Sequence, residues 1–216
     1  KVFGTKGLPI KLELCAGTGD WVVAQAHAET GRAAWVAVEL RYDRVQSMLA
    51  KMVLARVDNL SLLAGDAGSV LQRAIPPASL SNVCVNFPQP PQTDRTISCD
   101  EAVSELHLLT PTFFERVHVA LSQGGILTIF SDNHEYIRSL ARTIGSLLGP
   151  GGRIFAPCAD MPVEHIEAAE EVNGMLVCPG LPGPEVGHAV KCLSQFDRFF
   201  QHGQHTERFY LAATKA

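Results

Sequence analysis

Strand-like and helix-like segments alternate along the first two thirds of this chain, and no other feature constrains its fold as strongly. Apolar runs predict strands over residues 10–15, 34–39, 60–64, 80–86 and 126–130. Helical periodicity predicts helices over residues 21–29, 41–57, 69–74, 110–121 and 133–148. Such alternation favours a parallel sheet with helices on both faces. Sheets of this kind bind ligands beyond the carboxyl ends of their strands, which here places together the loops at 16–20, 39–41, 65–67, 86–92 and 131–133.

The remainder of the chain is less regular. Residues 149–190 are rich in Gly and Pro, with a helix expected only around 163–172, and a last strand is expected over 209–213. We therefore interpret residues 1–216 as a single domain with an irregular insertion at about 157–190. Asp20 is expected to cap the first helix, and Thr110 to cap the fourth.

Composition excludes several classes of protein. Hydrophobic residues make up 46% of the chain and charged residues 19%, a balance that excludes a disordered chain. The apolar runs are far shorter than the roughly 18 residues of a transmembrane helix, so no membrane association is expected. A net charge of −4 does not predict the basic face of a nucleic-acid binder, although an acidic chain can still carry a local basic patch.

The six cysteines form no C-x-x-C pair and match no zinc-binding spacing. We expect reduced thiols in an intracellular protein. The compartment (cytoplasm, nucleus or an organelle such as the mitochondrion) stays open, because the chain starts at Lys1 and shows no targeting segment. No metal site is expected, because an incomplete ligand set favours polar surface positions for His188, Cys192, His202 and His205.

A glycine-containing loop follows the first expected strand, in the run Glu13-Leu-Cys-Ala-Gly-Thr-Gly19. Gly17 and Gly19 would let a ligand approach the backbone closely. A dinucleotide-binding fingerprint requires a third glycine where this chain has Val22. The loop therefore suits S-adenosylmethionine, which has no phosphate, better than a nicotinamide cofactor. A tight turn without any ligand explains the loop equally well when it is taken alone.

Two further carboxylates follow the next two expected strands. Glu39 lies 20 residues after Gly19, where it can accept hydrogen bonds from both hydroxyls of a ribose. Asp66, in the run Gly-Asp-Ala, can reach an adenine edge. The alternatives are a solvated glutamate and a helix-capping aspartate. Together with Glu13, three acids at successive strand ends favour a nucleoside-binding site over those alternatives.

These motifs resemble those of the tRNA (guanine-N7)-methyltransferases of the TrmB type, and the resemblance covers nearly the whole chain. The family's L-E-I-G-x-G-x-G-[DN], G-I-E and G-D-A resemble residues 12–20, 37–39 and 65–67. Its N-F-P-D-P-W, T-D-N and T-x-[YF]-E resemble residues 86–91, 131–133 and 194–197. The Asn-Phe-Pro and Ser-Asp-Asn elements are far more specific than the glycine loop.

The resemblance implies an α/β fold of the Rossmann-like class I S-adenosylmethionine-dependent methyltransferases, with a seven-stranded, mostly parallel sheet. The implied activity is methyl transfer to guanine N7 in RNA (tRNA or rRNA). By the same analogy, the cofactor-binding residues are Glu13, Gly17, Gly19, Glu39, Asp66, Ala67 and Asn86. The catalytic positions are Asp132 and Gln89, and the substrate-binding residues are Asp132, Ser194, Asp197 and Arg198.

The departures from the family pattern are concentrated at the substrate end. Gln89 replaces the family's aspartate, and Arg95 is the single basic residue between positions 89 and 107 apart from a histidine. Guanine N7 carries a free lone pair and needs alignment more than a general base, so the weaker acceptor predicts reduced activity rather than none. The missing cations predict weak RNA binding unless a partner protein supplies a basic surface.

A second hypothesis therefore stays open. The chain is then a catalytically weak or inactive methyltransferase-like subunit with a structural role in an RNA–protein assembly, for example during ribosome assembly. Because the cofactor acids are retained in a chain whose substrate loop has changed, we favour the enzyme.

Overall fold

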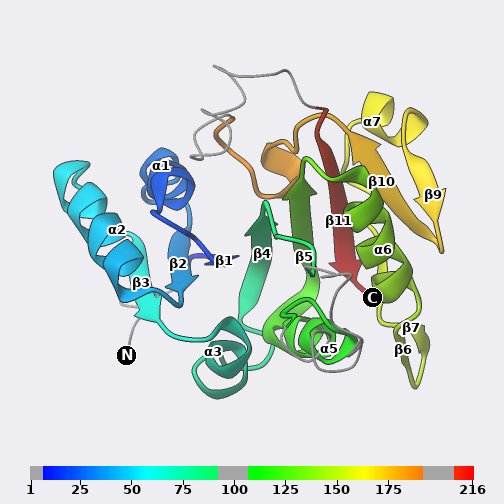
Figure 1. The fold of residues 1–216 in the computed structure, drawn as a ribbon, viewed down its shortest axis with the longest axis horizontal. Coiled ribbons are helices and arrows are strands. Elements are labelled where there is room, and N and C mark those ends of the chain that lie inside the picture. Colours follow the sequence, from blue (N-terminus) through cyan, green and yellow to red (C-terminus); the bar gives the residue numbers. More distant parts are fainter. Residues whose placement is uncertain (1–6, 92–106, 192–206) are drawn as a thin grey trace, which may run out of the picture.

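A computed structural model of the chain describes residues 7–91, 107–191 and 207–216, and its centre is a sheet of nine strands. The strands lie in the order β3-β2-β1-β4-β5-β11-β10-β9, and β8 pairs with β11 (Figure 1). The parallel strands are β1 (Ile10–Leu14), β2 (Ala34–Glu39), β3 (Leu60–Ala64), β4 (Leu80–Asn86) and β5 (Leu121–Ser131). The antiparallel strands are β8 (Phe155–Pro157), β9 (Glu170–Val172), β10 (Met175–Pro179) and β11 (Phe209–Lys215).

The sheet has nine strands instead of the seven that the resemblance implies, and three of them, β8, β9 and β10, lie in the region that was expected to be irregular. β8 and β9 have three residues each, which is too short to show an alternating pattern in the sequence. The helix expected around 163–172 is limited to α7 (Val163–Glu167), and the chain then enters β9. About half of the insertion at about 157–190 thus lies in short regular elements.

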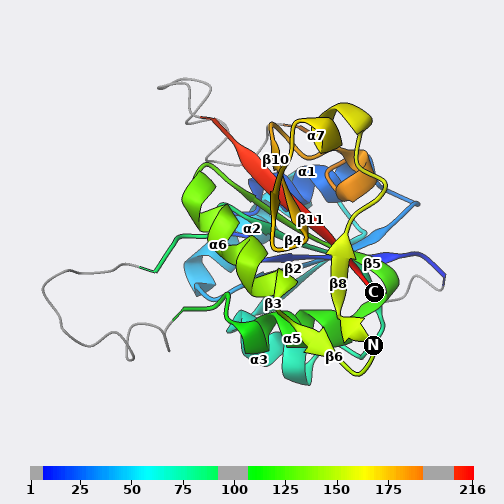
Figure 2. The same ribbon diagram turned by 90° about the vertical axis from the view of Figure 1, so that its right-hand side faces the viewer.

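Helices cover both faces of the sheet, as expected. One face carries α3 (Ala67–Arg73), α5 (Pro111–Ala120) and α6 (His134–Gly145), whose apolar side chains join Val36 and Val38 of β2 in the main core. The other face carries α1 (Asp20–Ala28) and α2 (Tyr42–Leu54), which pack on Trp35 and Ala37 of the same strand. Successive residues of a strand point to opposite faces, which explains this division. Figure 2 shows α1 on one side of the sheet and α3 and α5 on the other.

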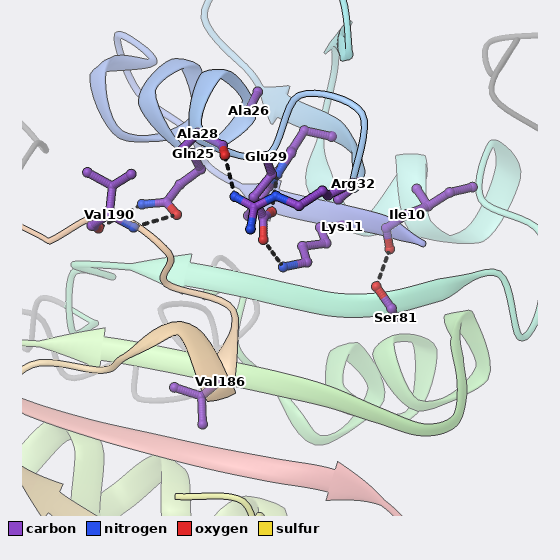
Figure 3. A network of polar contacts seen from close by, with 12 residues as sticks. Ile10, Lys11, Gln25, Ala26, Ala28, Glu29, Arg32, Ser81, Val186 and Val190 are labelled. Carbon is purple, nitrogen blue, oxygen red and sulfur yellow. Dashed lines mark hydrogen bonds and ion pairs between the residues drawn. The ribbon is translucent and has the colours of Figure 1, made fainter. Parts of the chain in front are cut away.

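Beyond α1, the second face is covered by residues 180–191, which we call the 180–191 segment. It contains the single-turn helix η1 (Pro184–Val186), which lies against β5. Thr128 of β5 donates a hydrogen bond of 2.7 Å to the carbonyl of Val186. The side-chain amide of Gln25 in α1 donates to the carbonyl of Val190 and accepts from its N–H, at 2.8 and 3.1 Å (Figure 3). Buried polar side chains therefore fix this segment to the helix and to the sheet.

Several element ends differ from the expectation. The first helix is capped by Gly19 with φ of 77°, and Asp20 is its first helical residue and forms an ion pair with Lys51. Thr110 does cap α5, accepting from the N–H of Phe113 at 3.3 Å. β5 begins at Leu121 rather than 126, since the strand continues through the two glycines with an irregular register beside Leu80.

A separate hairpin lies outside the main sheet. It is formed by β6 (Leu148–Gly149) and β7 (Gly152–Arg153), which have two residues each. Among the described residues, no helix has the length and apolarity needed to span a bilayer.

Candidate functional site

The glycine loop lies at the carboxyl end of β1, between α1 and the ends of β2 and β4. Gly17 has φ of 59° and faces open space, so a ligand can reach the backbone there. Gly19 also has a structural reason to be glycine, because a Cβ at this position would lie 2.2 Å from the side chain of Met48. Gly19 therefore allows α1 and α2 to pack closely, and the open part of the loop is at Gly17.

Glu39 lies beside this loop and is 4% exposed, which excludes the alternative of a solvated surface glutamate. Its Oε2 accepts a hydrogen bond of 2.8 Å from the backbone N–H of Gly17, and its Oε1 accepts one of 3.0 Å from the N–H of Arg41. The guanidinium of Arg44 is 3.9 Å from Oε2. Each carboxylate oxygen has two acceptor sites, so the group can still accept from two hydroxyls.

Glu13 lies on β1 and is 3% exposed. Its Oε1 accepts a hydrogen bond of 2.8 Å from the side-chain amide of Asn86, whereas its buried Oε2 has no hydrogen-bond partner among the described residues. Burial, together with the nearby charge of Glu39, raises the pKa of the Glu13 carboxyl to about 8, and the Asn86 hydrogen bond partly opposes this increase. An unpartnered carboxyl oxygen next to the loop fits a ligand that brings a hydrogen-bond donor.

His188 in the 180–191 segment continues this polar contact. Its Nε2 lies 3.0 Å from Oδ1 of Asn86, and the imidazole is 3% exposed between the rings of Trp21 and Phe130. The expectation of a polar surface position was therefore wrong for this histidine. Burial lowers the pKa of His188 to about 3, so the imidazole is neutral at physiological pH.

Asp66 follows β3 and confirms the helix-cap interpretation, because its Oδ1 accepts a hydrogen bond of 2.8 Å from the N–H of Ser69 in α3. The same residue lines a cavity of about 290 Å³ that also borders Gly68, His107 and Arg116. Ala67 is buried in the core under α3, so it can contact a ligand only through its backbone. Capping by one oxygen leaves the other available to a ligand at this strand end.

The substrate-side residues surround the ends of β4 and β5. Phe87 adopts a left-handed conformation with φ of 49° and packs against Phe130, with ring centroids 4.8 Å apart. Gln89 and Asp132 follow these two strands and are exposed to solvent. Ser194, Asp197 and Arg198 lie outside the described residues, as do Cys192, His202 and His205. The described part of the chain contains no group of three potential metal ligands.

Comparison with known proteins decides the family. Residues 8–148 match the model of a family described as "Putative methyltransferase". The chain belongs to this methyltransferase family. The matched range includes the glycine loop, Glu39, Asp66, the Asn-Phe-Pro sequence and Asp132. The range ends before the 180–191 segment.

Individual relatives agree with that assignment. The chain is 34% identical over 150 residues to a tRNA (guanine-N(7)-)-methyltransferase of Chlamydia muridarum, covering 69% of this chain and 63% of the relative. The chain thus spans less than two thirds of the length of that relative.

Two solved structures share the fold at low identity. TrmN from Thermus thermophilus has a TM-score of 0.56 at 14% identity, covering 97% of this chain and 45% of its own. A SAM-dependent O-methyltransferase from Thermotoga maritima has a TM-score of 0.54 at 12% identity, covering 96% and 59%. The fold is that of the class I methyltransferases.

Two buried residues that fix the 180–191 segment, Gln25 and Thr128, were not singled out from the sequence. Gln25 is fully buried and occupies the inner face of α1 together with Trp21 and Val22. A polar residue at the apolar positions of an amphipathic helix was a visible signal.

Within the described residues, Cys15, Cys84, Cys158 and Cys178 are free thiols, as expected.

Proposed function

We propose that this protein is an S-adenosylmethionine-dependent methyltransferase that methylates guanine N7 in tRNA. The observation that carries the proposal is the pair of buried carboxylates, Glu13 and Glu39, beside the open backbone of Gly17 at the carboxyl edge of the sheet. The name of the relative from Chlamydia muridarum supports the tRNA substrate and the position of methylation. Because the chain spans 63% of that relative, the activity is a proposal for this protein.

The residues fit S-adenosylmethionine. Glu39 would accept the two ribose hydroxyls without giving up its backbone contacts, which hold its carboxylate in a fixed orientation. Asp66, which follows the neighbouring strand β3, would accept a hydrogen bond from the edge of the adenine ring. The unpartnered Oε2 of Glu13 would accept from the positively charged methionyl amine, directly or through one water molecule. Gly17 would admit the nucleoside close to the backbone.

When bound, the cofactor supplies an electrophilic methyl group on a sulfonium centre. Guanine N7 needs no proton removed before it attacks, so the protein must mainly align the base. Asp132 and Gln89, at the ends of adjacent strands β5 and β4, would accept hydrogen bonds from the amino edge of guanine. A neutral amide at position 89 holds the base less strongly than a carboxylate would, so methyl transfer would be slow.

Binding of the RNA backbone would depend on a partner protein with a basic surface. The reason is the shortage of cations in the substrate loop, where Arg95 stands alone among residues 89–106. A location inside the cell is part of this proposal, since tRNA is found there. The structural-subunit hypothesis is not favoured, because the carboxylates that face the cofactor cleft are retained and buried.

The experiment is a methyl-transfer assay with tritiated S-adenosylmethionine and two transcripts of one tRNA. One transcript carries guanine, and the other carries 7-deazaguanine at every guanine position, which removes the N7 lone pair and leaves the rest of the base unchanged. We expect label in the first transcript and none in the second, with a higher rate after addition of cell extract. Equal labelling of both transcripts would contradict methylation at N7. A blank for both, with and without extract, would favour the structural subunit.

A further inference from the structure

We propose that His188 is a positioning residue of the cofactor cleft, which fixes the side-chain amide of Asn86 and, through it, the carboxylate of Glu13. The inference deepens the proposed function and rests on it in one respect, namely that the ligand of Glu13 is the methionyl amine of S-adenosylmethionine. His188 lies beyond residues 8–148, the region matched by the family model, and none of the family motifs named above contains it.

The hydrogen-bond donors in this chain of contacts have a single consistent direction. Oε1 of Glu13 lies 2.8 Å from Nδ2 of Asn86, which must donate to the carboxylate. Oδ1 of the same amide must then accept, and Nε2 of His188, 3.0 Å away, carries the proton that it accepts. In the tautomer that carries its proton on Nε2, the imidazole favours the orientation of the Asn86 amide in which Oδ1 faces His188. In the opposite orientation, the amide oxygen would face Glu13 and repel its carboxylate once that group is ionised.

His188 is itself held rigidly, as a positioning residue must be. Its backbone N–H donates to the carbonyl of Gly183 at 3.0 Å, and its ring packs 4.7 Å from that of Trp21. Gly187 precedes it with φ of 94°, and a Cβ there would lie 3.0 Å from the side chain of Asn82 on β4. The two hydrogen bonds between Gln25 and Val190 fix the segment on the other side (Figure 3). The segment thus places the imidazole against the sheet in one position.

The ionisation of Glu13 is the property that this contact controls. The donated hydrogen bond from Asn86 stabilises the charged carboxylate, and burial and Glu39 oppose ionisation. Loss of the correct amide orientation would therefore raise the pKa of Glu13 and weaken its attraction for a cationic amine. The other charged or titratable groups around Glu13 lie on β1, β2, β4, α1 and α2, and are Lys11, Cys15, Glu29, Glu39, Arg44 and Cys84. Lys11 is paired with Glu29, and none of these groups forms a hydrogen bond with Oε2 of Glu13.

The test compares His188→Met, which keeps an apolar side chain but removes the donor, with His188→Gln, whose amide N–H can still reach Asn86. Calorimetry measures S-adenosylmethionine binding between about pH 6 and about pH 10, a range that spans the expected titration of Glu13. For the wild type, affinity should rise on the acidic limb of the profile as Glu13 loses its proton, and fall at higher pH because the methionyl amine loses its own proton with a pKa of about 7.7–8.0; the midpoint that is compared between variants is that of the acidic limb. For His188→Met, we expect binding about tenfold weaker near neutral pH and a midpoint shifted upward by about one pH unit. His188→Gln should stay within about twofold of the wild type.

A second readout needs no cofactor. Carbon NMR of the chain labelled at glutamate side chains follows the titration of Glu13, and the pKa should rise in His188→Met and return in His188→Gln. His118→Met is the control, because burial also lowers the pKa of His118, which is less buried than His188 and packs on Phe155 on the other face of the sheet. If His188→Met does not fold, Gln25→Met releases Val190 without altering the imidazole and should shift the midpoint in the same direction, by less.

Three results would count against the role of His188. The role is overturned if His188→Met binds S-adenosylmethionine with the affinity and the pH midpoint of the wild type. It is also overturned if His118→Met weakens binding as much as His188→Met does, or if His188→Gln fails to bind like the wild type. The failure of the proposed function would look different: the wild type itself would not bind S-adenosylmethionine at any pH, and the cofactor role of His188 would be overturned with it.

Discussion

The backbone N–H of Gly17 donates a hydrogen bond of 2.8 Å to Oε2 of Glu39, and this contact joins the loop after β1 to the end of β2. β1 and β2 are adjacent parallel strands, so their carboxyl ends lie side by side at the same edge of the sheet. The contact makes Glu39 responsible both for the shape of the loop and, in the proposed function, for the ribose of the cofactor.

Substitution Glu39→Ala should therefore lower S-adenosylmethionine affinity at least about tenfold and destabilise the fold. The N–H groups of Gly17 and Arg41 lose their acceptor, at a cost of about 1–3 kcal/mol in the free energy of unfolding. Calorimetry and urea denaturation measure the two effects. Glu135→Ala is the control, because Glu135 is exposed and contacts only Arg138. Equal cofactor affinity in Glu39→Ala and the wild type would show that Glu39 does not hold the cofactor.

Substitution Gln89→Asp should raise the rate of methyl transfer by about threefold to tenfold, since a charged acceptor holds the amino edge of guanine more strongly than an amide. The variant restores the aspartate that the related family carries at this position. Single-turnover transfer to tRNA is the measurement. Gln123→Asp makes the same change at an exposed position near the start of β5, far from the carboxyl edge, and should leave the rate unchanged. A rate increase in both variants would point to a general effect of charge.

Substitution Cys15→Gly should raise the free energy of unfolding by up to about 1 kcal/mol. Cys15 adopts φ of 58°, and this left-handed conformation destabilises the folded state by about that amount for any residue other than glycine. Urea denaturation gives the change. The neighbouring Ala16→Gly is a useful contrast: Ala16 is not among the residues with positive φ, so glycine there adds chain entropy to the unfolded state and removes a methyl group that packs on the core around Trp21 and Trp35. Ala16→Gly should therefore destabilise, and a destabilised Cys15→Gly would mean that the thiol makes a favourable contact that outweighs the backbone strain.

The pH dependence of stability should reflect Glu13 and His188 together. The pKa of Glu13 is raised from 4.5 to about 8, so the folded state holds a proton that the unfolded state loses, and stability falls as pH rises through this range. The pKa of His188 is lowered from 6.5 to about 3, so stability falls as pH drops below 6.5. Between 4.5 and 6.5 the two effects oppose each other.

Glu13→Gln isolates the alkaline part of this profile. We expect the wild type to lose stability between pH 6.5 and 8 with a slope of up to about 1.4 kcal/mol per pH unit, and the variant to lack that loss. Urea denaturation at a series of pH values measures both. Parallel profiles for the two proteins would mean that Glu13 is not protonated in the folded state.

The parallel half of the fold was predictable because its strands are continuous apolar runs with clear turns between them. The bounds of β2, β3 and β4 agree with the expectation at every residue. The short strands β8 and β9 were not predictable, because three residues carry no periodic pattern and their pairing depends on β10 and β11. Asp20 was wrongly expected to be the cap, since Gly19, in the left-handed conformation with φ of 77°, is the cap residue and Asp20 is the first residue of α1.

The positions of Glu39 and Glu13 near the carboxyl ends of β2 and β1 were predictable from the sequence, and their role in cofactor binding stays a prediction. The partners of these carboxylates were less predictable, because a hydrogen bond such as that between Asn86 and His188 joins residues 102 positions apart. Only the folded chain brings them together. The resemblance to a family gave no guidance on His188, since the matched region ends before it.

The attachment of the 180–191 segment across the second face of the sheet also determines the smallest fragment of this chain that can fold stably. A fragment ending at residue 148 would contain all of the matched family region, yet Trp21, Asn86 and Thr128 would be left open to water. Truncation at the family boundary should therefore give an unstable, aggregation-prone product, and any attempt to transplant the motif region into another scaffold must carry the distal third of the chain with it.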